Sequence, residues 1–135
     1  MNDLPGLVRD LVASRPGAPA FSVDSIAVGG ATLQTHYEAT GALAKIRGGG
    51  FTHVVLQGQS VEPLADSGNF LDYAERLGVE ARQAGAEVVY FETWARRAGD
   101  AVYMESWSGG TPEAFNGRLH TAYSQVAAQV MGAVA

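Results

Sequence analysis

The chain has 135 residues, of which 47% are hydrophobic and 17% are charged, and this composition is typical of one compact soluble domain. Its formal net charge of -5 and its nine scattered basic residues argue against a nucleic-acid surface, because phosphate binding requires clustered Lys and Arg. There is no cysteine, which excludes disulfides and thiolate metal sites and leaves the compartment open. No stretch approaches the roughly 18 continuous apolar residues of a membrane helix, and the N-terminus lacks the residue order of a signal peptide, so we expect no membrane association.

The N-terminal part of the sequence predicts a helix followed by a strand. Asn2 or Asp3 can cap the helix, and Arg15-Pro16-Gly17 ends it. The segment Phe21 to Val28 is rich in apolar and β-branched residues and is expected to be the first strand, which stops at Gly29-Gly30. The residues that share one face of the predicted helix are Leu4, Leu7, Val8 and Leu11.

A second helix and a second strand are predicted next. The helical region runs from about Leu33 to Ile46, and the triple glycine Gly48-Gly49-Gly50 breaks it. The run Thr52 to Leu56 is short and apolar, as in strands that are buried on both faces of a parallel sheet. The polar sequence QGQSVEPLADSG that follows is expected to be a loop.

The rest of the chain predicts a helix, a third strand and a long final helix. Apolar residues recur at helical spacing from Asn69 until Gly85, and Glu87 to Phe91 is the third strand. Thr111-Pro112-Glu113 supplies a cap, a proline and an early acid, which together mark the start of the final helix. The sequence ends at Ala135 soon after this helix, and we expect no further strand.

Strands separated by crossover helices favour a parallel sheet with helices on both faces. We therefore expect one α/β domain over residues 1–135, with the three-layer architecture of flavodoxin-like proteins. In such sheets ligands bind beyond the carboxyl ends of the strands. That edge would hold Gly29-Gly30, the segment from Gln57 to Ser60, and the segment from Glu92 to Trp94.

The stretch VVLQGQS, from Val54 to Ser60, resembles the third conserved block of SGNH/GDSL hydrolases, which usually reads Gly-x-Asn-Asp. Gln59 stands at the position of the asparagine that donates a hydrogen bond to the oxyanion. Gln57 replaces the glycine and Ser60 replaces the aspartate of that block. The turn AVGGATL resembles the second block, whose glycine offers a backbone N–H to the same oxyanion, and Gly30 is assigned to it, with Gly29 nearly as good.

The resemblance also implies that two catalytic segments lie outside this sequence. The opening NDLPGLVRDLV resembles the helix that follows the block with the nucleophilic serine, and the ending QVMGAVA resembles the approach to the strand before the Asp-x-x-His block. The chain is therefore expected to be the truncated, inactive centre of an ester or acyl-ester hydrolase that needs no metal or organic cofactor. Its substrate would be a small acylated molecule, with carbohydrate esters among the options. The oligomeric state stays open.

Several alternatives remain at the level of sequence. Gly29-Gly30 can be a simple turn, Gln57 and Gln59 can be loop amides, and Trp94 can cover the core edge instead of contacting substrate. Ser60 lies in GQSVE, only half of a nucleophile elbow, and the three histidines lack close metal-ligand spacing. The rival functions are a non-enzymatic flavodoxin-like binding module and a catalytically dead paralogue.

Overall fold

The computed structural model describes residues 3–135, so Asn2, one of the two predicted caps, lies outside the described residues. Asp3 is the cap, because its Oδ1 accepts a hydrogen bond from Gly6 N at 3.0 Å. Within this range no helix has the combination of length and hydropathy that a membrane crossing requires. The elements, in chain order, are α1 (Leu4–Ala13), α2 (Leu33–Glu38), α3 (Ala42–Arg47), β1 (His53–Leu56), α4 (Glu62–Ala65), α5 (Ser67–Gln83), β2 (Glu87–Tyr90), the 3-10 helix η1 (Ala101–Met104), α6 (Pro112–Val130) and β3 (Ala133–Val134).

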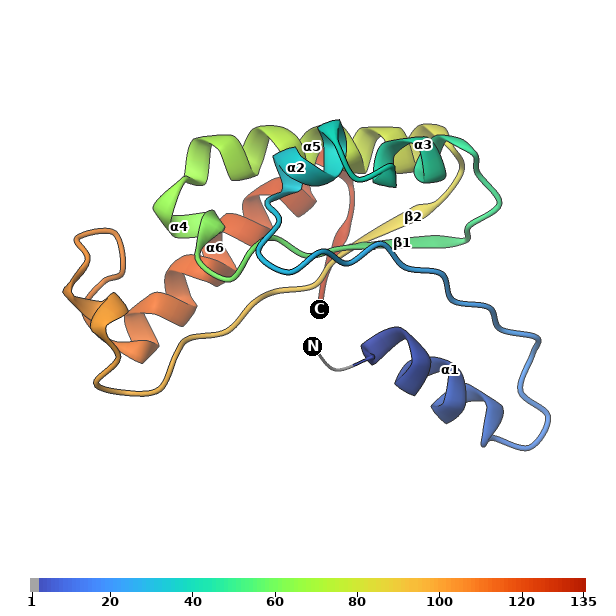
Figure 1. The fold of residues 1–135 in the computed structure, drawn as a ribbon, viewed down its shortest axis with the longest axis horizontal. Coiled ribbons are helices and arrows are strands. Elements are labelled where there is room, and N and C mark those ends of the chain that lie inside the picture. The colour runs from blue at the N-terminus through green and yellow to red at the C-terminus, as the bar shows by residue number, and fades with distance from the viewer. Residues whose placement is uncertain (1–2) are drawn as a thin grey trace.

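The three strands form one parallel sheet in the order β1-β2-β3 (Figure 1). In its register His53 pairs with Glu87 and Leu56 pairs with Tyr90, so β1 and β2 end at the same level. The prediction of an α/β fold with a small parallel sheet is confirmed. The carboxyl ends of β1 and β2 therefore place the loops that follow them side by side.

Helices α5 and α6 pack against each other and against one face of the sheet. Gly78 of α5 makes this approach possible, because an added Cβ would lie 2.3 Å from the Tyr90 hydroxyl and 3.1 Å from Val130. The same hydroxyl donates to the carbonyl oxygen of Ala74 at 2.8 Å, which satisfies it inside the core. Tyr90 is fully buried, and both helices pack against the strand that carries it.

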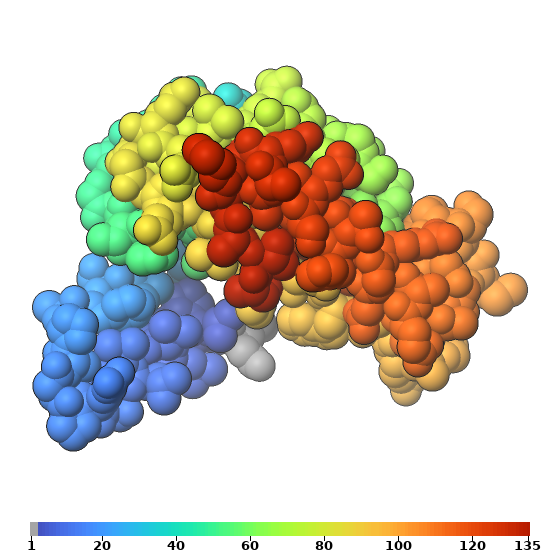
Figure 2. Space-filling model, turned by 180° about the vertical axis from the view of Figure 1, so that it is seen from behind, coloured from blue at the N-terminus to red at the C-terminus, as the bar shows by residue number. Residues whose placement is uncertain are grey.

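The other side of the sheet is more open. Val55 of β1 is 62% exposed, and α1 lies on this side in Figure 1 without covering it. The apolar stripe predicted for α1 is itself exposed, with Leu7 at 60% and Leu11 at 71%. Seen from behind, the N-terminal segment forms a blue lobe beside the rest of the molecule (Figure 2).

Two expectations about the strands are wrong. The segment Phe21 to Val28 forms no strand, and Phe21 and Val28 are both about half exposed. Within it Ser25 N donates to Asp24 Oδ1 at 2.8 Å, and Asp24 also forms an ion pair with Lys45 of α3. The expectation of no strand after the last helix is also wrong, because β3 follows α6 and pairs with Val89 and Tyr90 of β2.

The helices follow the prediction more closely. Thr111 caps α6 by accepting from Ala114 N at 3.2 Å, as expected from its sequence. The predicted helix from Leu33 to Ile46 is instead two helices, because Gly41 adopts a φ of 82° between α2 and α3. The predicted loop after β1 contains the short helix α4, which begins at Glu62.

Candidate functional site

The candidate site lies where the loops after β1 and β2 meet the turn before α2. Gln57 directly follows β1 and is exposed, whereas Gly58 is buried and Gln59 is half-buried. Gln59, Ser60 and Glu62 are linked to one another by hydrogen bonds, whereas none is recorded for the Gln57 side chain in residues 3–135.

Gly58 fits its position because there is no room for a side chain. A Cβ atom here would lie 3.0 Å from the Phe70 ring and 3.3 Å from Glu62 Oε2. Gly58 N–H also donates to the hydroxyl of the buried Tyr123 at 3.2 Å. Burial raises the pKa of that hydroxyl, so it stays protonated. These contacts fix the backbone of the loop immediately before Gln59.

The side-chain amide of Gln59 has a defined orientation. Its Oε1 accepts from Val61 N at 2.9 Å and from Glu62 N at 3.2 Å. Because two backbone N–H groups contact the same end of the amide, that end must be the oxygen. The Nε2 group therefore faces away from α4, and it donates to Ser60 Oγ at 3.3 Å.

Glu62 is a buried carboxylate, with only 3% of the residue exposed. Its Oε2 accepts from Gln59 N at 3.0 Å, and its Oε1 accepts from Leu33 N at 3.1 Å. Burial raises the pKa of Glu62, although the two backbone N–H groups act against this and Asp66 adds to it. One side chain thus contacts both the loop after β1 and the start of α2.

The glycine pair lies in a tight turn just before α2. Ala31 N donates to Val28 O at 3.1 Å across this turn, and Gly30 has a φ of 78°, which favours glycine. Thr32 then caps α2 by accepting from Thr35 N at 3.1 Å. The turn and the cap define the path from Gly30 to Leu33.

Ser60 is held by the loop that follows β2. Arg96 Nη2 donates to Ser60 Oγ at 3.2 Å, and Thr93 Oγ1 donates to Ser60 O at 3.4 Å. Together with Gln59, Arg96 makes the Ser60 hydroxyl an acceptor of two hydrogen bonds. None of the contacts recorded for Ser60 in residues 3–135 comes from a histidine.

Trp94 is 69% exposed and lies on the loop after β2. Two hydrogen bonds anchor the backbone directly after Trp94. Ala95 N donates to Asn116 Oδ1 at 2.8 Å, and the Tyr103 hydroxyl donates to Arg96 O. Trp94 therefore presents a large flat surface to solvent from a fixed backbone. The structure does not use it to cover the core, which was the alternative expected from sequence.

The hydrogen bonds recorded for His36 and His120 go to residues other than Ser60. His120 Nδ1 lies 3.0 Å from Glu92 Oε2, and its Nε2 lies 3.4 Å from Ser124 Oγ. His36 contacts Thr40, and burial lowers the pKa of His36. In the described part of the chain, no cluster of three or more His, Asp or Glu side chains could hold a metal ion.

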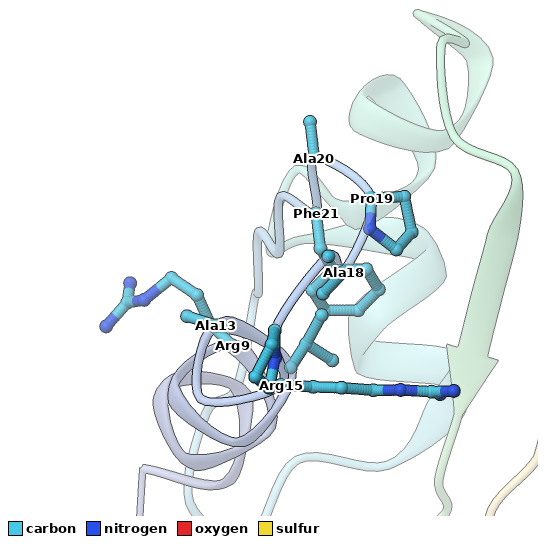
Figure 3. A pocket seen from close by; sticks show the side chains of 10 residues that line it. Arg9, Ala13, Arg15, Ala18, Pro19, Ala20 and Phe21 are labelled. Atoms are coloured by element: carbon cyan, nitrogen blue, oxygen red, sulfur yellow. The ribbon is translucent and has the colours of Figure 1, made fainter.

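Two hollows of the surface lie elsewhere. One, of about 440 Å³, is lined entirely by residues 9–21, with Arg15 and Phe21 at its wall (Figure 3). Another, of about 560 Å³, lies beside Tyr37 and Arg47. Neither includes a residue from the carboxyl ends of the strands, so we place the candidate site by its hydrogen bonds and not by a cavity.

Sequence reasoning missed the residues that support the site. Glu62 was assigned to a loop, and Tyr123 was not named among the residues of the final helix. The spacing of Gln59 and Glu62 is a usable signal, because residues three apart at a helix start can exchange hydrogen bonds. Nothing in the sequence indicated the contact from Glu62 to Leu33.

Comparison with known proteins agrees with this architecture. No family model matches the chain, and no curated protein sequence matches it at a significant level. Its structure is similar to that of a protein described as a putative SGNH hydrolase from Slackia heliotrinireducens, with a TM-score of 0.68 and 29% sequence identity. The match covers 78% of this chain and 59% of the other, so the chain spans about three fifths of that neighbour. The likeness supports an SGNH-like α/β fold.

Proposed function

We propose that residues 29–62 form the oxyanion-binding half of an SGNH-type serine ester hydrolase. Gly30 N–H and Gln59 Nε2–H are the two proposed donors. The observation that carries this proposal is the orientation of the Gln59 amide, whose oxygen is occupied by Val61 N and Glu62 N. The amide nitrogen is thereby kept as a donor directed away from the helix.

The chemistry requires donors of this kind. When a nucleophile attacks an ester, the carbonyl oxygen gains negative charge, and hydrogen-bond donors already in place stabilise that charge. Gln59 Nε2 carries two hydrogens, of which the Ser60 contact occupies one. In residues 3–135, no acceptor is recorded for Gly30 N–H. Both donors therefore have capacity for a substrate oxygen.

The proposal assigns the nucleophile and its Asp-His pair to sequence outside residues 1–135. Ser60 lacks a histidine partner among the described residues, whereas Ser124 Oγ on α6 lies 3.4 Å from His120 Nε2, and His120 Nδ1 lies 3.0 Å from Glu92 Oε2. Acyl transfer needs a nucleophile and a base as well as oxyanion donors. The chain by itself is accordingly proposed to bind and polarise an ester without cleaving it.

The substrate is proposed to be a small ester or acylated molecule, with no cofactor needed for its hydrolysis. Gln57, Ser60 and Trp94 are the proposed substrate contacts. The exposed indole of Trp94 offers an apolar face of the kind that packs against a sugar ring or an acyl chain.

The test is active-site labelling with a fluorophosphonate, followed by peptide mass spectrometry. The 135-residue chain should stay unlabelled, and the protein expressed together with its flanking coding sequence should be labelled at a serine outside residues 1–135. The variants Ser60→Ala and Ser124→Ala should not change this pattern. Labelling at Ser60 or Ser124 would overturn the assignment of the nucleophile, and no labelling in either protein would favour a non-enzymatic binding module.

A further inference from the structure

We propose that Glu62 is a positioning residue: its buried carboxylate joins the loop after β1 to the start of α2 and so sets the distance between Gln59 and Gly30. The consequence for catalysis rests on the proposed function. The link itself is a structural statement that holds whether or not the protein is an ester hydrolase.

Gln59 and Glu62 form a reciprocal pair. Gln59 N donates to Glu62 Oε2 at 3.0 Å, while Glu62 N donates to Gln59 Oε1 at 3.2 Å and to Gln59 O at 3.0 Å. This exchange has the logic of a capping box, with a glutamine in the place of the usual serine or threonine. It fixes both the backbone and the side chain of Gln59 relative to α4.

The contact to Leu33 goes beyond such a local cap. Leu33 N donates to Glu62 Oε1 at 3.1 Å and to Oε2 at 3.3 Å, and the two residues are 29 positions apart in the sequence. A cap of α4 would be complete without this bond. Its effect is to place the N-terminus of α2 next to the loop that carries Gln59.

The position of Leu33 in turn determines that of Gly30. The turn from Val28 to Ala31 and the Thr32 cap leave little freedom in the two residues between Gly30 and Leu33. A short, hydrogen-bonded path therefore runs from Gly30 through Leu33 and Glu62 to Gln59. Oxyanion donors must be held in place before the reaction to be effective, and this path provides such a constraint.

Because Glu62 is buried, the link that it forms is sensitive to the protonation state of its carboxylate. A buried carboxylate loses its hydration, and protonation of Glu62 would weaken its acceptance of two backbone N–H groups. Asp66, at the end of α4, adds to the raised pKa of Glu62, and Glu62 in turn raises the pKa of the Tyr123 hydroxyl on α6. Asp66 is exposed, so it can be changed without disturbing the core.

The test is an NMR pH titration of the ¹⁵N-labelled 135-residue chain that follows the amide protons of Gln59 and Leu33. Both signals should move together with a single midpoint above the ordinary range of glutamic acid. The Asp66→Asn variant should lower that shared midpoint, because it removes a negative charge. In Glu62→Gln, both amides should lose the titration.

Different midpoints for the two amides, or an unchanged titration in Glu62→Gln, would overturn the proposal. The wild-type chain and Asp66→Asn decide the matter even if Glu62→Gln fails to fold. This experiment involves no ester, so its outcome is independent of the labelling test for the proposed function. If the two amides share a titration but no fluorophosphonate labelling occurs, the Glu62 link is supported and the proposed hydrolase function is rejected.

Discussion

The hydroxyl of Tyr123 accepts a hydrogen bond from Gly58 N–H at 3.2 Å, and this bond joins the core helix α6 to the loop that carries Gln59. Tyr123 is fully buried, and its ring contacts Phe70 edge to face with centroids 5.0 Å apart. Core packing and site geometry are thus coupled at a single side chain.

Removing this hydroxyl should destabilise the protein. In Tyr123→Phe the buried Gly58 N–H loses its acceptor, and we expect the free energy of unfolding to fall by about 1–3 kcal/mol. Chemical denaturation measures this. Tyr73→Phe is the matched control, because the Tyr73 hydroxyl contacts Glu38 at the surface. An equal loss in both variants would contradict the coupling.

A methyl group at position 58 should be harmful as well. Gly58→Ala would bring a Cβ within 3.0 Å of the Phe70 ring, and overpacking of this kind costs about 1–3 kcal/mol. Gly117→Ala, on an exposed position of α6 with open space around it, should instead stabilise by about 0.5–1 kcal/mol. Thermal denaturation of the two variants should show shifts of opposite sign. Equal melting temperatures would exclude a close approach at Gly58.

The stability of the protein should depend on pH through Glu62. Its pKa is raised in the folded protein, so the unfolded chain ionises first as the pH increases, and the folded state loses stability between the unfolded and folded pKa values. The free energy of unfolding of the wild type, relative to Glu62→Gln, should therefore fall as the pH rises from about 4 to neutrality. Urea denaturation across this range measures the difference. A relative gain in stability over the same interval would contradict the assigned direction.

The exposed stripe of α1 should bind hydrophobic dyes. The side chains of Leu7 and Leu11 are 60% and 71% exposed, and Val55 on the open face of the sheet is 62% exposed. The double variant Leu7→Gln/Leu11→Gln should reduce dye fluorescence with little change in stability. Val79→Gln, an apolar position of α5 that is 39% exposed, is the control and should leave the fluorescence unchanged. Equal fluorescence in all three proteins would place the dye site elsewhere.

Much of the fold could be predicted because its main elements carry local signals. β1 and β2 are short apolar runs, and α6 begins at Thr111-Pro112 with a cap and a proline. The segment Phe21 to Val28 was wrongly predicted because apolar content does not reveal whether a pairing partner exists. β3 has two residues, too few for any periodic pattern, and it follows a helix that ends at Met131 with a φ of 54°.

The site was harder to predict than the fold. Gln59 was assigned because it follows a strand, and the glycine turn because it precedes a helix, although the strand expected before that turn does not form. Glu62 could not be recognised as buried, since its burial depends on Leu33 and on the packing of Gly58 against Phe70. Contacts between segments far apart in sequence decide which polar residue supports the site.

The most direct test of the account is the kinetics of Gln59→Ala in an active enzyme that carries the nucleophile block. If Gln59 donates mainly in the transition state, kcat should fall by about 100-fold with little change in KM, and fluorophosphonate labelling should slow in parallel. Gln125→Ala, at an exposed position of α6, is the control and should retain wild-type kinetics. If the folded Gln59→Ala enzyme keeps kcat within about twofold of the wild type, the loss is far smaller than that expected for an oxyanion donor. Gln59 would then be only a loop amide.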